Sequence, residues 1–162
     1  MKKIIALILL LSCAFSMASC SLVPVHDSAD LVLILEECGY EVTDVDEEVQ
    51  EGIVGYIYGY NSETKDEIYY IYCENIMSAK RIYDYASSKQ KAKIAELKME
   101  IEKIEYALYK SEGISAAEKG DYYEKYVEKT EELEKVENYS CGHGFNVVWY
   151  GTKQAVADIK KG

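Results

Sequence analysis

The sequence contains little proline, little arginine and no apolar run long enough to cross a bilayer. One proline among 162 residues argues against disordered linkers. Arg81 is the single arginine and the net charge is −11, so the chain lacks the positive surface that phosphate backbones attract, and we expect no nucleic-acid partner. The unbroken apolar run covers residues 4–11 and falls short of the ~20 residues of a membrane-spanning helix.

Cysteine is also scarce, and its number is odd. Two of the five cysteines, Cys13 and Cys20, lie in the N-terminal segment, which leaves Cys38, Cys73 and Cys141. Three thiols cannot all pair within one chain, so at most one disulfide forms among them. No close Cys-x-x-Cys pair is present, and we expect the three to be reduced and half-buried.

The N-terminal segment has the architecture of an export signal. Lys2 and Lys3 precede the apolar run, and the small residues Ala18 and Ser19 precede Cys20. The stretch from residue 17 to 20 resembles a bacterial lipobox, with Met17 where leucine is usual. The resemblance implies that residues 1–19 are a signal peptide and that Cys20 carries a diacylglycerol group. It places the chain on the extracytoplasmic face of a bacterial plasma membrane.

Two alternatives to lipidation of Cys20 remain open. The stretch Leu10-Leu11-Ser12-Cys13 fits the same pattern, but it leaves only about seven apolar residues before it, the lower limit for a signal peptide. Ser16-Met17-Ala18 also matches a small-x-small cleavage site, which would give a secreted protein.

Removal of residues 1–19 leaves 143 residues, enough for one domain. Lys2 and Lys3 are then lost, so 16 basic residues face 29 acidic ones and the net charge is −13. A negative chain cannot bind anionic membrane lipids through a polybasic segment, so membrane contact should come from the lipid attached to Cys20. We divide the mature chain into a tether, residues 20–26, and a single domain, residues 27–162.

The first elements of the domain are a short helix and an acidic segment. Leu31, Ile34, Leu35 and Cys38 form one apolar helical face, and Gly39 ends the helix. Residues 41–52 contain six acidic side chains, but the glycine that a calcium-binding EF-hand loop needs at its sixth position, counted from Asp44, is absent. We therefore interpret 41–52 as a solvated acidic loop.

Residues 53–60 and 67–73 predict an antiparallel hairpin around a polar turn at 61–66. Both runs are rich in tyrosine and β-branched residues that alternate between two faces. A shift of the turn by one residue decides which faces combine, so the register stays open. In one register five tyrosines form an aromatic platform: Tyr56, Tyr58, Tyr60, Tyr70 and Tyr72.

An aromatic platform with hydroxyl groups suits sugars, peptidoglycan peptides or a protein partner. The alternative is that these tyrosines pack under the helices, because one face of a sheet must be covered in a domain of this size.

Helical periodicity begins at Ile76, and residues 76–88 are suited to pack on the sheet. Residues 90–110 then show a coiled-coil seam, and Ser115 with Glu118 forms a capping box that opens a second helix at about 116–137. We predict an antiparallel helical hairpin over about 90–137 and a monomeric chain. Self-association through the same seam is the rival hypothesis. The seam residues are Ile94, Leu97, Ile101, Ile104 and Leu108.

The C-terminal part predicts two more strands, at 138–141 and 145–150, around a turn at Gly142-His143-Gly144. Thr152 then caps a last helix that runs to Ile159. The predicted fold class is α+β: a small antiparallel sheet covered by helices, with a projecting, coiled-coil-like helical hairpin.

This order of elements resembles small uncharacterised lipid-anchored lipoproteins of Gram-positive bacteria. The resemblance is carried by the lipobox, residues 37–42 after the first helix, residues 67–72 leading into Ser78-Ala79-Lys80, and residues 147–150. It covers about half of the mature chain and implies an α-β-β-α-β-β-α domain and a location, but no activity. The helical insert is longer than that pattern implies, and the third strand is shorter.

No catalytic or cofactor-binding motif stands out. Cys141 and His143 supply two metal ligands, whereas a zinc site needs three or four. A Cys-His nucleophile needs an orienting group and an oxyanion site, and neither can be identified. We therefore expect no cofactor, no metal and no catalytic residue. The sequence favours a non-enzymatic envelope lipoprotein that binds a cell-wall or protein partner. An envelope hydrolase or transferase acting on cell-wall material is the alternative.

Overall fold

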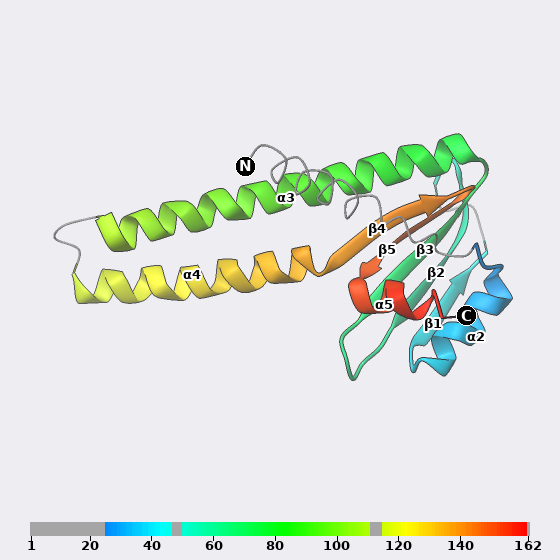
Figure 1. Cartoon of the computed structure of the whole chain (residues 1–162), viewed down its shortest axis with the longest axis horizontal. Coiled ribbons are helices and arrows are strands. Elements are labelled where there is room, and N and C mark those ends of the chain that lie inside the picture. The colour runs from blue at the N-terminus through cyan, green and yellow to red at the C-terminus, as the bar shows by residue number, and fades with distance from the viewer. Residues whose placement is uncertain (1–24, 47–49, 111–114, 162) are drawn as a thin grey trace, which may run out of the picture.

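The computed structural model of the chain describes residues 25–46, 50–110 and 115–161. It contains a five-stranded antiparallel sheet with helices on both faces, and a helical arm that extends well beyond the sheet (Figure 1). The predicted α+β class with a projecting helical hairpin is confirmed. The expected signal segment and Cys20 lie outside the described residues, as do residues 111–114 between the two predicted helices of the hairpin. None of the described helices is long and apolar enough to span a membrane.

The sheet has the strand order β1-β2-β3-β5-β4, and every neighbouring pair is antiparallel. The β2–β3 hairpin has the predicted bounds because period-two alternation on both sides of a polar turn leaves little choice. The whole arm lies in the sequence between β3 and β4, which belong to the same sheet. The strands are β1 (Glu41–Val45), β2 (Ile53–Tyr60), β3 (Glu67–Cys73), β4 (Tyr139–Gly144) and β5 (Val147–Thr152).

The first strand corrects the sequence interpretation. Residues 41–45 form edge strand β1, paired with β2, and are not part of an acidic loop. Val42 packs against the core, whereas Glu41 and Asp44 are exposed. Charged side chains are usual on an edge strand, because they discourage pairing with another chain. The acidic composition of this strand concealed it.

The turn between the last two strands is also not where the glycines predicted it. β4 continues through residues 142–144, and the chain reverses at Phe145 and Asn146. A Cβ atom on Gly142 would lie 2.5 Å from the Trp149 ring, so this glycine makes room for the indole.

One face of the sheet is covered by α2 (Ser28–Glu37) and α5 (Lys153–Asp158). Asp27 caps α2, and Gly39 follows its end with a φ of 81°. Thr152 caps α5. The core of this face holds the following buried residues: Leu31, Leu35, Tyr40, Ile57, Ile68, Tyr70, Val147, Trp149, Ala155, Val156 and Ile159.

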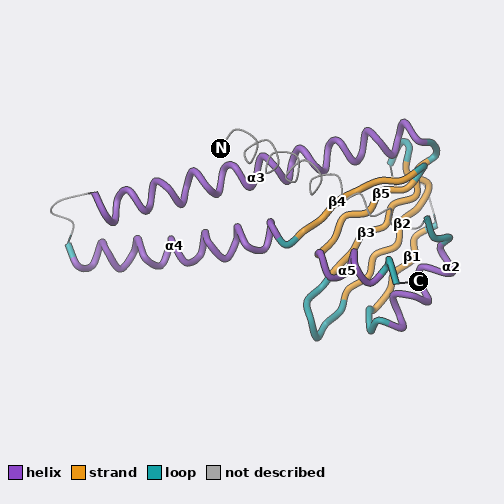
Figure 2. Tube along the Cα trace, in the orientation of Figure 1, coloured by secondary structure: helices purple, strands orange, loops and turns teal. Residues whose placement is uncertain are grey.

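The opposite face is covered in part by α3 (Ile76–Lys110), which contacts β3, β4 and β5. Ala79 is fully buried there against Cys73 and Val148. The same helix then leaves the sheet and becomes the first half of the arm (Figure 2). One continuous helix of 35 residues therefore serves both the sheet and the arm.

The second half of the arm is α4 (Ala116–Glu137), which returns along α3. The predicted capping box between Ser115 and Glu118 is present. Leu97 is fully buried in the seam, whereas none of the α4 residues is fully buried. Ion pairs on the solvent-accessible surface join the two helices, and each contributes little. They are Lys93–Glu132 (2.9 Å), Lys98–Glu137 (2.8 Å) and Glu100–Lys129 (3.2 Å).

The base of the arm is fixed by Gln90. Its Nε2 donates hydrogen bonds to the backbone oxygens of Val136 (3.0 Å) and Tyr139 (2.9 Å), where α4 passes into β4. The arm is thus attached to the sheet at both of its helices.

Candidate functional site

The register of the β2–β3 hairpin decides which tyrosines share a face. Tyr60 pairs with Glu67, Tyr58 with Tyr69, and Ile57 with Tyr70. Residues paired directly across two strands point to the same side. Tyr56, Tyr58 and Tyr60 therefore lie on one face, and Tyr70 and Tyr72 lie on the other. The platform of five tyrosines proposed from the sequence is split between the two faces.

Tyr70 and Tyr72 belong to the core under α2 and α5, where they hold the N-terminal end of the domain. The backbone N–H of His26 donates to the Tyr70 hydroxyl (3.2 Å), and the Tyr72 hydroxyl donates to the His26 carbonyl oxygen (3.4 Å). Burial raises the pKa of both hydroxyl groups. His26, at the end of the expected tether, is therefore bound to the domain.

The other face carries a larger set of tyrosines than the sequence suggested. The β2–β3 register adds Tyr69, and the pairing of β3 with β5, and of β5 with β4, adds Tyr150 and Tyr139. The ring centres of Tyr58 and Tyr69 lie 4.6 Å apart, and those of Tyr139 and Tyr150 lie 5.0 Å apart. We call this surface the tyrosine face. It consists of Tyr56, Tyr58, Tyr60, Tyr69, Tyr139 and Tyr150.

Glu67 is the first residue of β3 on the tyrosine face and accepts hydrogen bonds from two of these hydroxyl groups. Tyr58 donates to its Oε2 (3.0 Å), and Tyr139 donates to its Oε1. Burial and the bond to this carboxylate raise the pKa of Tyr58 to about 12, and the same causes raise that of Tyr139. Both hydroxyl groups stay protonated at neutral pH. Their protons are directed to Glu67, so each oxygen can accept a further bond from a ligand.

Part of the tyrosine face is open to solvent. α2 and α5 pack on the opposite side of the sheet, and α3 covers β4, β5 and part of β3. Tyr69 is 38% exposed, and Tyr56, Tyr58 and Tyr60 are half-buried. Where the face meets α3 there is a hollow of about 300 Å³. Its lining consists of Ala86, Lys89, Gln90, Lys93, Val136 and Tyr150.

The described cysteines and His143, which were considered for metal binding or nucleophilic chemistry, do not form a reactive site. Cys38, Cys73 and Cys141 are free thiols whose pKa values are raised chiefly by burial, which disfavours the reactive thiolate. His143 lies against the ring of Tyr83, with 4.7 Å between ring centres. Within the described ranges, no group of three or more His, Cys, Asp or Glu side chains could hold a metal ion.

The sequence interpretation missed Tyr69, Tyr139, Tyr150 and Glu67. One signal for Glu67 was available, because a turn made of all six residues 61–66 pairs Tyr60 with Glu67 and brings Tyr58 close to it. The contribution of β4 and β5 could not be inferred, because nothing local in the sequence specifies that β5 pairs with β3.

Comparison of the chain with protein-family models, curated proteins and solved structures finds no match to any of them.

Proposed function

We propose that the protein is a non-enzymatic binding module of the bacterial cell envelope, anchored by a lipid on Cys20, and that it binds cell-wall material through the tyrosine face. The observation that carries the proposal is the group of tyrosines around Glu67 on a partly uncovered sheet face. Structural packing alone would favour a complete apolar cover over so many aromatic rings.

The chemistry of the tyrosine face favours a ligand that is flat or apolar on one side and rich in hydrogen-bond donors. Tyrosine rings supply apolar contact area, and the hydroxyl oxygens and Glu67 supply acceptors. The carboxylate of Glu67 disfavours anions beside it on the face. Amino sugars with their hydroxyl and amide N–H groups, and the short peptides attached to them in peptidoglycan, have the required character.

The same hydrogen bonds favour binding over catalysis. Each oxygen of Glu67 already accepts a tyrosine hydroxyl, which restrains this carboxylate from moving a proton to or from a substrate. The neighbouring hollow contains two lysines among its six lining residues, and none of the six is a carboxylate or a cysteine. A hydrolase that uses paired carboxylates therefore receives no support from this surface.

Tyr69→Ala tests the binding surface. We expect the affinity of the mature chain for soluble disaccharide-peptide fragments of peptidoglycan to fall by roughly tenfold, because an exposed ring at the centre of the face is removed. Isothermal titration calorimetry measures the change. Tyr109→Ala is the matched control, since Tyr109 is 75% exposed on the arm and should leave the affinity unchanged. Equal effects of both variants, or no binding by the wild type, would refute the proposed ligand.

The lipid anchor is tested by the intact mass of the mature protein made in a Gram-positive host. We expect a chain that begins at Cys20 and carries a diacylglyceryl adduct. Cys20→Ala should release the protein from the membrane fraction or block its maturation. An N-terminus at Ser19 without lipid would instead establish secretion and contradict the anchor.

A further inference from the structure

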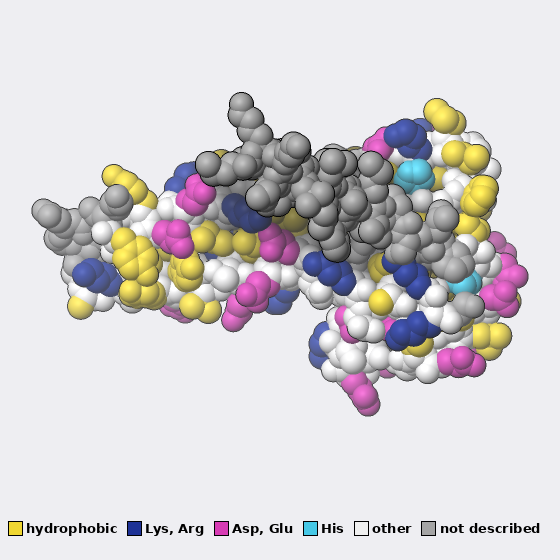
Figure 3. Space-filling view, viewed as in Figure 1, with side chains coloured by type: hydrophobic (Ala, Val, Ile, Leu, Met, Phe, Trp, Pro, Cys, Tyr) yellow, Lys and Arg dark blue, Asp and Glu magenta, His cyan; other side chains and the backbone are white. Residues whose placement is uncertain are grey.

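The end of the sheet opposite the arm tip carries large apolar side chains in contact with solvent. Met77 is 75% exposed, Phe145 72%, Ile76 58% and Val25 44%. Ile76, Met77 and Phe145 line one shallow hollow, with Glu74 at its rim. Figure 3 shows hydrophobic side chains gathered at this end. We call Val25, Ile76, Met77 and Phe145 the apolar end.

Phe145 has no role in the folded core that would account for its position. It forms the β4–β5 turn with a φ of 50°, a conformation that is costly for a bulky side chain and easy for Gly or Asn. The turn is fixed by Asn146, whose backbone oxygen accepts from the N–H of Cys73 (2.7 Å) and whose Nδ2 donates to the Cys73 oxygen (3.1 Å). A rigid turn thus holds an aromatic ring outward into solvent, which indicates a partner outside the domain.

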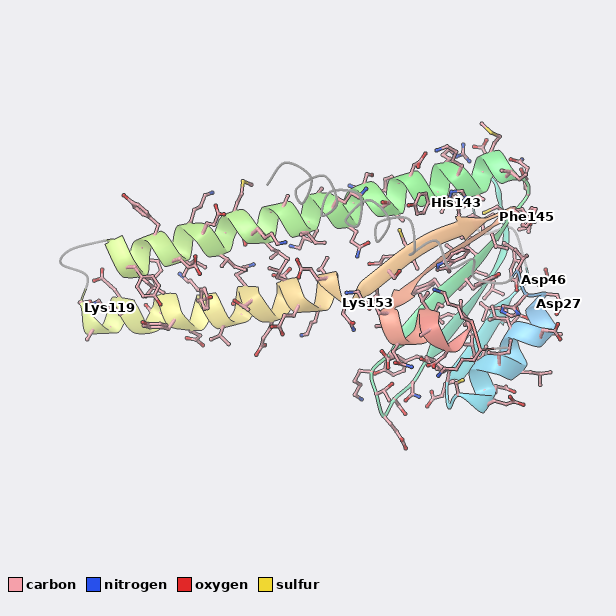
Figure 4. The ribbon with its side chains drawn as sticks, viewed as in Figure 1. Asp27, Asp46, Lys119, His143, Phe145 and Lys153 are labelled. Atoms are coloured by element: carbon pink, nitrogen blue, oxygen red, sulfur yellow. The ribbon has the colours of Figure 1, made fainter. Side chains whose placement is uncertain are left out.

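The chain itself indicates what that partner is. Val25 is the first described residue, and its Cγ2 lies 3.9 Å from where a Cβ atom on Gly144 would be, next to the turn at Phe145. Figure 4 shows Phe145 and Asp27 at this end of the molecule and Lys119 at the opposite end. Five residue steps separate Cys20 from Val25 and span at most about 18 Å. A lipid on Cys20 would therefore hold the apolar end at the bilayer surface.

Charge agrees with an apolar contact. The mature chain has a net charge of −13, and Glu74 borders the apolar end, so anionic headgroups would not attract it. Burial of Phe, Met and Ile in the interface between headgroups and acyl chains does not need charge attraction. Carboxylates at the rim can stay in the hydrated headgroup layer.

We infer that the apolar end docks on the lipid bilayer, with Phe145 and Met77 inserted among the headgroups. The inference rests on the proposed lipid anchor, which brings the surface within reach. Docking makes the domain stand on the membrane in one orientation, with the arm directed away from the membrane and the tyrosine face turned sideways.

Thiol accessibility in vesicles tests the docking. The lipidated Met77→Cys protein is incorporated into phosphatidylcholine vesicles, and its labelling by a membrane-impermeant maleimide is followed by peptide mass spectrometry. The reference is the labelling rate of the same site in the non-lipidated chain, residues 21–162. Tyr109→Cys is the matched control, because Tyr109 lies on the same helix, is equally exposed at 75%, and is near the other end. Phe145→Cys is the second test position.

We expect the vesicle-bound rate at positions 77 and 145 to fall about tenfold or more, and the rate at position 109 to stay unchanged. Full burial of a large apolar side chain shifts an equilibrium by roughly tenfold to a hundredfold. Equal labelling at all three positions, in protein whose mass includes the diacylglyceryl adduct, would overturn the docking and leave the anchor intact. If positions 77 and 145 were labelled slowly in the non-lipidated chain in solution, the result would contradict membrane docking. It would indicate instead that the apolar end contacts a second copy of the chain. Absence of the adduct would remove the anchor and the docking together.

Discussion

Leu97→Asp should separate the two helices of the arm while the sheet stays folded. Leu97 is fully buried in a seam to which α4 contributes no fully buried residue, so this side chain carries a large share of the packing. An unpaired carboxylate at this position should cost the arm at least about 3 kcal/mol. Thermal circular dichroism should show early loss of helical signal. Fluorescence of the single tryptophan, Trp149, which lies in the sheet, should report a later transition.

Met99→Asp is the control for this prediction. Met99 is two residues away on the same helix and 56% exposed, so its replacement should cost only about 0.5 kcal/mol of helix propensity. Ile101, also in the seam, is half-buried and should give an intermediate effect. Sedimentation should find the wild type monomeric, since its seam is filled from the same chain. A wild-type dimer that Leu97→Asp converts into a fully helical monomer would contradict the intramolecular hairpin.

Gly151→Ala should destabilise the sheet at its centre. A Cβ atom on Gly151 would lie 2.5 Å from the backbone oxygen of Glu67 and 2.8 Å from the Cα of Ile68. Both contacts are with the backbone of β3, so no side chain can move to relieve them. We expect a loss of about 3 kcal/mol in the free energy of unfolding and a melting temperature lower by roughly 10 °C.

Gly120→Ala is the same substitution, but we expect it to raise the free energy of unfolding instead of lowering it. Gly120 lies in α4, and a Cβ atom there would meet nothing within 4 Å. Alanine should stabilise the helix by about 0.5–1 kcal/mol, because glycine loses more backbone freedom on folding. Chemical denaturation of both variants measures the difference. If Gly151→Ala were no more destabilising than Gly120→Ala, the result would contradict the close contact between the backbones of β3 and β5 at Gly151.

Local signals explain what the sequence predicted well. The β2–β3 hairpin has its predicted bounds because alternation and the turn at 61–66 act over short distances. The capping box at Ser115 and the Thr152 cap are likewise set by neighbouring residues. The arm followed from the 3-4 spacing of its apolar residues.

Contacts between residues far apart in the sequence explain the features that the sequence did not predict. Edge strand β1 is held by pairing with β2 and has an acidic composition that is typical of loops. Gly142 is required by the Trp149 ring and not by a turn. The tyrosine face combines β2, β3, β5 and β4, and Glu67 receives its second tyrosine from a residue 72 positions away. None of these contacts leaves a periodic signal.

The continuity of α3 gives the protein a fixed mechanical length. The helix contains neither glycine nor proline, begins in the apolar end and reaches the distal part of the arm as a rod of about 50 Å. A force applied at the tip of the arm is therefore transmitted along α3 to the sheet. The helix would pivot at the contact between Ala79 and Val148. Removal of seven residues from α3 and seven from α4 would shorten the rod by about 10 Å and preserve the seam. The length of the arm can therefore change by whole heptads without any change in the sheet domain to which it is attached.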